Sequence, residues 1–395
     1  MRITIIVHIY HNRATLISRS IQIKRGKRLT ITIDMCQDTL DEEVRNYRPG
    51  DEERIVSFLN SHSSWPASSV NVPKVDHWKW KFLSNPAGPE LVCMIEVGCE
   101  LVSYCASMPV RMNAGGREVL ATQGVDLLTH PDYRGSGLMT KLLNHRDKLK
   151  TKRGIAFDFG FPNESSYHIS TKREGFRVLD LTMIQHRFII DRQGFFSKVN
   201  MGSLKWIGYS SYVALQRAVH RQGETDLIVQ NIESFSETDD TLYHKVSSDF
   251  DLMAVRDHQF LNWRYCDPRG GSYIVRGVRE DGKLLGYVVF KIESENQLII
   301  ADMLADPDRL EVISLLVTDV LNQGQYYGAE SVICCLPKNH QYERSLREMG
   351  FVSKPRMTGN MPMRMIWFPR SSQDLSILSS PGPVCHIMLG DTDWA

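Results

Sequence analysis

The loop Arg134-Gly-Ser-Gly-Leu-Met139 is the segment of this 395-residue chain whose residue types point most directly to chemistry. Glycine at positions 135 and 137 lets the backbone turn its N–H groups inward without interference from a Cβ atom. An apolar helix is expected to begin at Leu138, and the unpaired amides of a helix N-terminus carry partial positive charge. These features predict a cradle for a pyrophosphate group. By spacing alone, the motif fits a tight turn with a solvated arginine equally well.

The elements around this loop follow the order that such a cradle needs. A strand over Gly124–Thr129 precedes the loop, a helix over Leu138–Lys150 follows it, and a strand over Ile155–Phe161 comes next. The upstream pattern predicts a helix capped by Asp51 and several antiparallel strands, and the downstream pattern predicts a helix over Ser165–Arg173. We therefore expect an α/β fold of the α+β kind, with a central mixed β-sheet flanked by helices.

At these residues the sequence resembles the GNAT superfamily of acyl-CoA-dependent N-acetyltransferases, whose loop has the pattern Q/R-x-x-G-x-G/A. The match consists of Arg134, Gly135, Ser136, Gly137 and Leu138, while Met139 replaces the final small residue and crowds the first helical turn.

This resemblance covers about residues 90–180 and implies how acetyl-CoA would be held. The amides around residues 134–139 would hold the pyrophosphate, and Leu128 and Thr129 would pair with the pantetheine arm as an added strand does. Asn163 matches the family's asparagine that hydrogen-bonds pantetheine. The segment Gly160–Tyr167 further resembles a prokaryotic branch of GNAT proteins with two such domains.

Features of the first half recur in the second half at nearly constant spacing. Leu284–Tyr287 repeats Leu101–Tyr104 at an offset of 183, and from Asp302 onward the offset is 175 or 176. Five ordered correspondences favour an internal duplication over two unrelated α/β segments. At the place of the glycine loop the second copy reads Asp308-Arg-Leu-Glu-Val-Ile313, and a glutamate there would repel a pyrophosphate. The second copy is expected to bind no CoA and to serve as a scaffold or substrate wall.

The expected organisation of the chain has five parts. In order, they are a basic leader (1–39), a catalytic GNAT domain (40–190), a connection with a helix of its own (191–247), a degenerate second GNAT-like domain (248–370) and a C-terminal tail (371–395). The leader is either a disordered extension or a spurious upstream start, with Met35 as an equally good start of translation.

Acylation of an amine needs a polarised thioester carbonyl and a proton for the leaving thiolate. In the resembled family, a backbone N–H of the strand polarises the thioester carbonyl. Leu128 or Thr129 is the corresponding position in this chain. The family's thiolate-protonating tyrosine falls on Ser170 or Thr171 in this chain. Tyr167, one turn earlier, is the substitute if it faces the cleft, and packing of the helix is its alternative role.

The reaction also needs a base for the attacking nitrogen. Asp126 is the first candidate, ahead of His130 and Glu164. Alternatively, Asp126 is an ordinary salt-bridged residue of the strand. Asp302, at the matching place of the second copy, supports this alternative. Water is a further candidate for carrying the proton.

Composition limits the partners of the chain. It has 47 Lys and Arg against 46 Asp and Glu, and seven of these bases lie in residues 1–33 without any acid. No basic surface bias therefore favours nucleic acid. The basic run from Arg146 to Arg153 fits either a contact to the 3′-phosphate of CoA or a solvated helix end.

Neither metals nor membranes are expected as partners. The pairs His8/His11 and Cys334/Cys335 lack further ligands at metal spacing, so no metal is predicted. The eight cysteines show no C-x-x-C motif and are typical of free thiols in a reducing cytoplasm. No apolar run approaches the roughly 18 residues that span a bilayer.

We therefore expect a cytoplasmic tandem GNAT acyltransferase that moves an acetyl or short acyl group from CoA to an amine of a small molecule or protein. One alternative is a non-catalytic protein that binds or senses acyl-CoA. Another is an aminoacyl-tRNA-dependent peptidyltransferase of the same fold, against which the intact pyrophosphate loop argues. The sequence indicates neither the acceptor nor an oligomeric state.

Overall fold

The computed structural model describes residues 42–66, 70–88, 90–172, 174–191, 226–293 and 296–393. Within them the chain divides into two compact units. The first unit comprises residues 42–63, 92–105 and 126–147, and the second comprises the other described residues. The expected leader and the expected helix of the connection lie outside the described residues.

The first unit contains the strands and helices next to the glycine loop. Strand β1 (Glu42–Asn46) pairs antiparallel with β2 (Leu91–Val97). Strands β3 (Glu100–Ala114) and β4 (Arg117–Thr129) each belong partly to this unit and partly to the second. Helix α1 (Glu52–His62) buries its apolar face, and α3 (Leu138–Lys152) begins after the loop.

In the second unit the rest of β4 runs parallel to β5 (Phe157–Gly160), with Ala121 opposite Phe157. Strand β17 (Ile366–Pro369) lies between β5 and β6 (Arg177–Val178) and is antiparallel to both. Strand β9 (Leu252–Ala254) pairs antiparallel with β3 and parallel with β18 (Cys385–His386). The helices before and after these strands are α2 (Lys74–Phe82), α4 (Glu164–Lys172), α7 (Asp240–Val246) and α8 (His258–Leu261).

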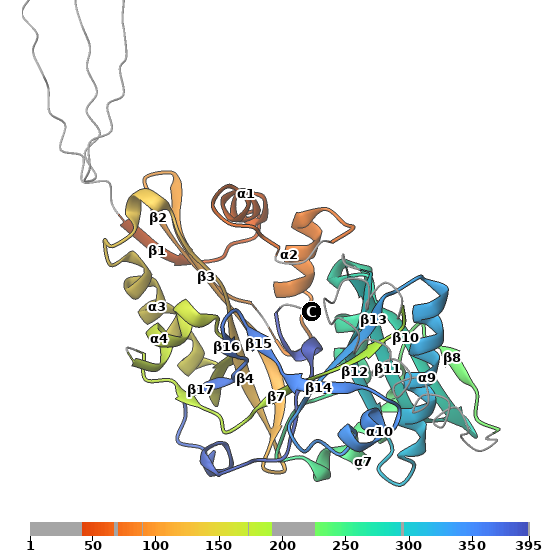
Figure 1. Cartoon of the computed structure of the whole chain (residues 1–395). Coiled ribbons are helices and arrows are strands. Elements are labelled where there is room, and N and C mark those ends of the chain that lie inside the picture. The colour runs from red at the N-terminus through yellow and green to blue at the C-terminus, as the bar shows by residue number, and fades with distance from the viewer. Residues whose placement is uncertain are drawn as a thin grey trace, which may run out of the picture. The chain divides into compact units, whose positions relative to one another are not determined.

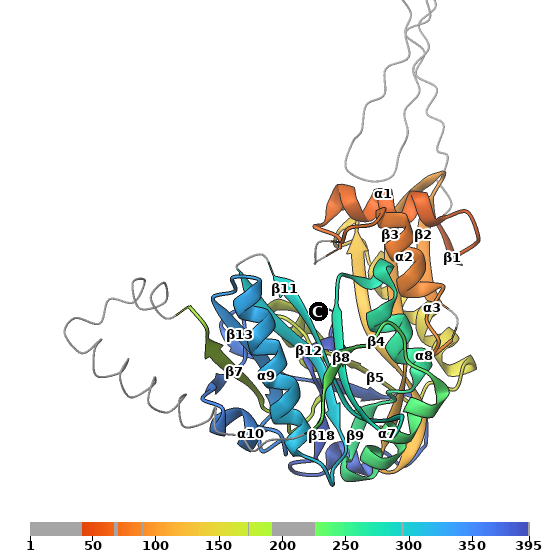
Figure 2. The same cartoon turned by 90° about the vertical axis from the view of Figure 1, so that its right-hand side faces the viewer.

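A separate seven-stranded sheet of order β14-β7-β13-β12-β11-β10-β8 lies wholly within the second unit. Helix α9 runs along one face of it (Figure 2). Val312, Leu316 and Val320 of this helix belong to the hydrophobic core. The bounds of these elements are β7 (Met183–Ile189), β8 (Val229–Asn231), β10 (Ile274–Glu280), β11 (Lys283–Glu293), β12 (Gln297–Ala305), α9 (Glu311–Tyr326), β13 (Ser331–Pro337), α10 (Glu343–Glu348) and β14 (Val352–Pro355). The mixed sheets with flanking helices confirm the expected fold class.

Both sheets combine strands from the two halves of the chain, and β9, β17 and β18 all belong to the sheet that contains β1 to β6. Strand β7, which follows β6 in the chain, lies between β13 and β14 (Figure 1). Strand β17, from the far end of the chain, pairs with both β5 and β6. Strands β7 and β17 thus each have antiparallel partners on both edges, although the second partner covers only part of each strand. Sheet membership therefore does not follow the domain boundaries expected at residues 190 and 248.

Trp80 and Trp263 hydrogen-bond to each other reciprocally in the second unit. The indole Nε1 of Trp80 donates to the carbonyl oxygen of Trp263 at 2.7 Å, and Nε1 of Trp263 donates to the carbonyl of Trp80 at 2.9 Å. Their rings stack with centroids 5.0 Å apart. Both side chains are buried in the core.

Replacing Trp80 or Trp263 with phenylalanine is expected to lower the free energy of unfolding by about 1–3 kcal/mol, because a buried carbonyl loses its donor. Urea unfolding followed by circular dichroism measures the loss. Trp367→Phe is the matched control, because Nε1 of the buried Trp367 has no hydrogen-bond partner among the described residues. Equal losses for Trp80→Phe and Trp367→Phe would contradict the role of the reciprocal bonds.

Candidate functional site

The end of β4 is fixed against β3 in the first unit. The N–H of His130 donates to the carbonyl of Val102 at 2.8 Å, and the hydroxyls of Ser103 and Thr129 lie 3.0 Å apart. Leu128 and Thr129 are half-buried. The strand end that the resemblance assigns to the pantetheine arm is thus held by both backbone and side-chain contacts.

Both glycines of the loop adopt conformations that other residues avoid. Gly135 has φ +80° and Gly137 has φ +87°, in the left-handed region. A Cβ atom built at either position would meet no atom within 4 Å. The space beside the loop is therefore open, and backbone conformation is the reason for glycine here.

The loop leads directly into the N-terminus of α3. The carbonyl of Gly137 accepts from the N–H of Lys141 at 3.1 Å, so Gly137 caps the helix. The amides of residues 137–140 then have no acceptor within the helix. No acidic side chain lies in the first turn, and residues 134–137 are exposed while Leu138 is buried. This arrangement presents N–H donors and partial positive charge to an anion, so it fits a pyrophosphate.

The helix start at residues 308–313, which the expected duplication places opposite this loop, is filled by side chains. Val312 and Ile313 are fully buried, and a Cβ built on Gly286 would lie 2.8 Å from Cγ1 of Val312. Arg309 pairs with Glu311 at 2.6 Å and with Glu280 at 2.8 Å. Apolar packing and ion pairs thus take the place that is open beside Gly135 and Gly137.

Asp126 has φ +51°, which puts a non-glycine residue in the left-handed region inside β4. Aspartate and asparagine tolerate this conformation better than most residues. The side chain is half-buried. The backbone therefore gives a structural reason for aspartate at this position, in addition to the expected role as a base.

The remaining expected residues belong to the second unit, where α4 carries them. Asn163 caps this helix, because its Oδ1 accepts from the N–H of Ser166 at 3.0 Å and from the Ser166 hydroxyl at 2.8 Å. The hydroxyl of Tyr167 accepts from Nη1 of Arg364 at 3.0 Å, and the guanidinium also lies over the Tyr167 ring. Tyr167 thus keeps its own proton for donation, and Ser170 is half-buried one turn further on.

Arg364 was not anticipated, since it lies nearly 200 residues from Tyr167 in the sequence. The basic run Arg146–Arg153 also differs from expectation. Lys150 is buried and pairs with Asp158 at 2.8 Å, and Arg370 pairs with the same carboxylate. Burial alone would raise the pKa of Asp158, but the two cations outweigh it and lower the pKa. Lys150 is therefore part of the core, and neither of its expected roles applies.

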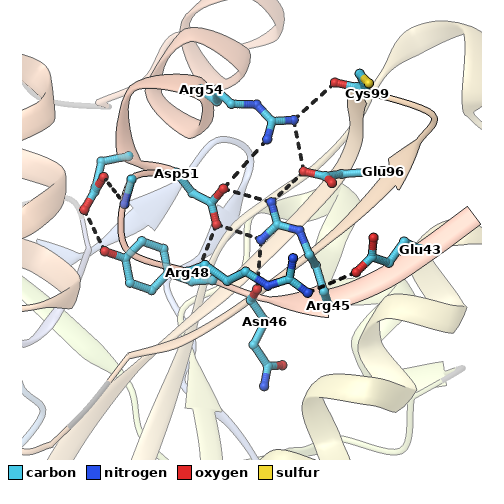
Figure 3. Close-up of polar contacts among 11 residues, drawn as sticks. Glu43, Arg45, Asn46, Arg48, Asp51, Arg54, Glu96 and Cys99 are labelled. Atoms are coloured by element: carbon cyan, nitrogen blue, oxygen red, sulfur yellow. Dashed lines mark hydrogen bonds and ion pairs between the residues drawn. The ribbon is translucent and has the colours of Figure 1, made fainter.

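The start of α1 is anchored by a cluster of buried charges in the first unit (Figure 3). Arg45 of β1 donates to both oxygens of Asp51 at 2.7 and 2.8 Å and to Glu96 of β2 at 2.6 Å. The hydrogen bond from Arg45 lowers the pKa of both carboxyl groups. Asp51 occupies the N-cap position, but its side chain makes no capping bond. The expected cap is wrong in this respect, because Arg45 and the N–H of Arg48 engage the carboxylate instead.

At the other end of α1, His62 lies beside His130. The ring centroids are 4.5 Å apart and nearly perpendicular. Sequence reasoning missed His62, because 68 positions separate it from His130 and no local pattern marks it.

Three further findings concern the described residues alone. They contain no group of three His, Cys, Asp or Glu side chains placed to hold a metal ion. Their seven cysteines are all free thiols. Among their helices, none has the length and apolar character needed to cross a membrane.

The sequence profile of the acetyltransferase (GNAT) domain family matches residues 43–178. No curated protein sequence matches the chain. A probable N-acyltransferase of unknown function from Enterococcus faecalis V583 is structurally similar, with a TM-score of 0.59 and 11% identity over 85% of this chain and 74% of that one. The GCN5-related N-acetyltransferase from Kribbella flavida has a TM-score of 0.55 and 12% identity, covering 83% and 70%.

The N-myristoyltransferase from Saccharomyces cerevisiae, solved with bound myristoyl-CoA and inhibitors, has a TM-score of 0.54 and 12% identity over 88% of this chain and 82% of that one. At such identities the similarity to solved structures concerns the fold alone. The profile match contains β4, the glycine loop and α3. Residues 43–178, about a third of the chain, are therefore similar to the acetyltransferase (GNAT) domain family.

Proposed function

We propose that the protein transfers an acetyl or short acyl group from CoA to an amine of a small molecule or protein, and that it acts in the cytoplasm. The family of residues 43–178 supports acyl transfer in general. The acyl donor would bind with its pyrophosphate on the amides of residues 134–139 and its pantetheine arm along Leu128 and Thr129. Asn163 is proposed as a further contact to that arm.

The observation that carries this proposal is the open helix start at Gly135 and Gly137. Two left-handed glycines, exposed amides and a first turn without acids combine at one point. The second half has no glycine at residues 308–313 and has Glu311 in the first turn of α9, and we propose that it is a degenerate copy that binds no CoA. A site retained in one copy and filled in the other supports selection for ligand binding.

Acyl transfer to an amine forms a C–N bond and breaks the C–S bond of the thioester. The carbonyl oxygen gains negative charge during attack, and the backbone N–H of Leu128 or Thr129 is proposed to stabilise it. Asp126 is proposed to take the proton that the nitrogen loses after attack. Tyr167 or Ser170 would protonate the departing thiolate, and the Arg364 contact leaves the Tyr167 proton available.

Asp126→Asn is expected to lower kcat by about a hundredfold, because it removes a general base. Asparagine tolerates the left-handed backbone, so the substitution separates chemistry from conformation. Thiol release from acetyl-CoA is measured over polyamines, aminoglycosides, amino sugars and lysine peptides. A kcat equal to that of the wild type would exclude Asp126 as the base.

A second candidate function is binding of acyl-CoA without catalysis. It is favoured by the serine and threonine at positions 170 and 171, where the resembled family has its tyrosine. Calorimetric binding of CoA without thiol release on any amine would support this function. Absence of CoA binding in the wild type would refute both functions.

A further inference from the structure

The imidazole of His62 is held by ring contacts. The Phe58 ring, one turn earlier in α1, has its centroid 5.1 Å away, and the His130 ring packs nearly perpendicular to it. Among the described residues, no hydrogen bond or ion pair occupies either ring nitrogen of His62. The side chain is half-buried, and its position is fixed without use of its polar atoms. A fixed imidazole with both nitrogens available is suited to exchange a proton with a ligand.

His130 links this ring to the proposed acyl-donor site. It directly follows Thr129, and its side chain is 18% exposed. Its Nδ1 accepts a hydrogen bond from the N–H of Asp132 at 3.2 Å, so the neutral ring carries its proton on Nε2. The lone pair of His130 is thereby engaged, whereas those of His62 are not. Of the two rings, His62 is the one able to accept a proton from a substrate.

The charged and titratable groups around the pair are few. The carboxylate of Asp132 lies 3.9 Å from Nδ1 of His130, and the Tyr133 ring lies 5.8 Å from the His130 ring. Nε of Arg134 donates to the carbonyl of Thr129 at 3.4 Å. The only ring packed against His62 from its own helix is the uncharged Phe58 among the described residues. Among the described residues, no carboxylate or cation thus forms an ion pair with His62.

The nitrogen of an amine acceptor loses two protons during acylation, and a single base does not take both. At neutral pH a primary amine is an ammonium ion without a lone pair, and it must lose one proton before attack. The nitrogen loses a second proton after the C–N bond forms. One of these protons ends on the coenzyme thiol and the other in solvent, so the reaction is balanced with two proton acceptors acting in turn.

We infer that His62 takes the first proton from the ammonium form of the acceptor and passes it to solvent, and that His130 is a positioning residue that holds the His62 ring. This inference rests on the proposed function. It names His62 as a catalytic residue because it would contact the acceptor nitrogen. It also assigns the acceptor side of the site to the end of α1, which the charge cluster of Arg45, Asp51 and Glu96 anchors at its other end.

A footprint tests the placement without any knowledge of the acceptor. Diethyl pyrocarbonate modifies accessible neutral imidazoles, and mass spectrometry reads each histidine of the full chain. Saturating acetyl-CoA is expected to slow modification of His62, whereas adenosine 3′,5′-bisphosphate, which lacks the thioester arm, is not. His244, an exposed histidine near the end of α7 with its ring 5.4 Å from Tyr243, is the control.

An unchanged rate at His62 with calorimetrically bound acetyl-CoA would overturn the inference and leave the proposed function standing. If acetyl-CoA does not bind at all, both the inference and the proposed function are refuted. The two failures are therefore distinguishable.

The kinetic test uses the amine of the panel that is acetylated fastest. His62→Gln is expected to lower kcat/KM for the amine by about a hundredfold at pH 7, and the loss should shrink as the pH approaches the amine's own ionisation. His130→Phe, which keeps a ring against His62, should retain more activity than His130→Ala. His244→Gln should match wild type. A loss that is the same at every pH would indicate a structural role and overturn the inference.

Discussion

Gly137→Glu is expected to abolish measurable binding of CoA. The new carboxylate would lie at the N-terminus of α3, where the proposed pyrophosphate contacts the amides. Two unit charges 4 Å apart repel by about 4 kcal/mol at an effective dielectric constant of about 20. A loss of this size weakens binding by more than about a hundredfold. Isothermal titration calorimetry with CoA measures the effect.

Two further glycine substitutions give an intermediate variant and a control for this prediction. Gly137→Ala adds only the strain of a left-handed φ, about 1–2 kcal/mol, and should weaken binding less. Gly328→Glu places the same side chain on a glycine with φ +68° and open surroundings, far along the chain after α9. It should bind CoA like the wild type. If Gly137→Glu also bound CoA like the wild type, the loop would not be the pyrophosphate site.

The loop was predictable because its determinants are local. Glycine at 135 and 137, the preceding strand and the apolar start of α3 all lie within about fifteen residues, and backbone conformation follows from nearby residues. Local pattern is less informative elsewhere, since proline is unusual inside a strand and β3 nevertheless continues through Pro109 to Ala114.

The combination of strands from the two halves of the chain in each sheet was not predictable, because strand pairing is not local. Nothing in the sequence of β7 distinguishes partners before it in the chain from β13, which begins about 140 residues later. The same limit applies to side-chain contacts. The sequence around Asp51 predicts a helix cap, but the buried guanidinium of Arg45 binds the Asp51 carboxylate instead. His62 was identified only by its contact with the ring of His130, which lies 68 residues later in the sequence.

Asp302, the residue that matches Asp126 in the second half, shows what such an aspartate does in the core. It is fully buried and accepts hydrogen bonds from Nε of Arg256 at 3.0 Å and from the Tyr287 hydroxyl at 2.9 Å. Nη2 of Arg256 also donates to Asp391 at 2.7 Å. Burial would raise the pKa of Asp302, but Arg256 outweighs it and holds the pKa below its usual range. The guanidinium of Arg256 thus forms ion pairs with two buried carboxylates.

Two histidines complete this cluster in their neutral forms. Nδ1 of His340 accepts from the N–H of Tyr342 at 3.2 Å, so His340 donates through Nε2 to Nδ1 of His386 at 3.0 Å. His386 therefore carries its proton on Nε2, which lies 3.7 Å from Asp302. Burial lowers the pKa of both imidazoles. Neither histidine supplies positive charge, so Arg256 alone balances the carboxylates among the described groups of this cluster.

Arg256→Met is therefore expected to lower the free energy of unfolding by about 3–5 kcal/mol, because it leaves two buried carboxylates without their cation. Urea unfolding followed by circular dichroism measures the loss. Adding Asp302→Asn and Asp391→Asn should restore much of the stability, since neutral amides are less costly to bury than unpaired charges. Arg344→Met, which breaks an exposed pair with Glu348, is the control and should unfold like the wild type. If Arg256→Met unfolded like Arg344→Met, the buried cluster would contribute no more than a surface ion pair, and the structural role of an aspartate at this strand position would lose its support.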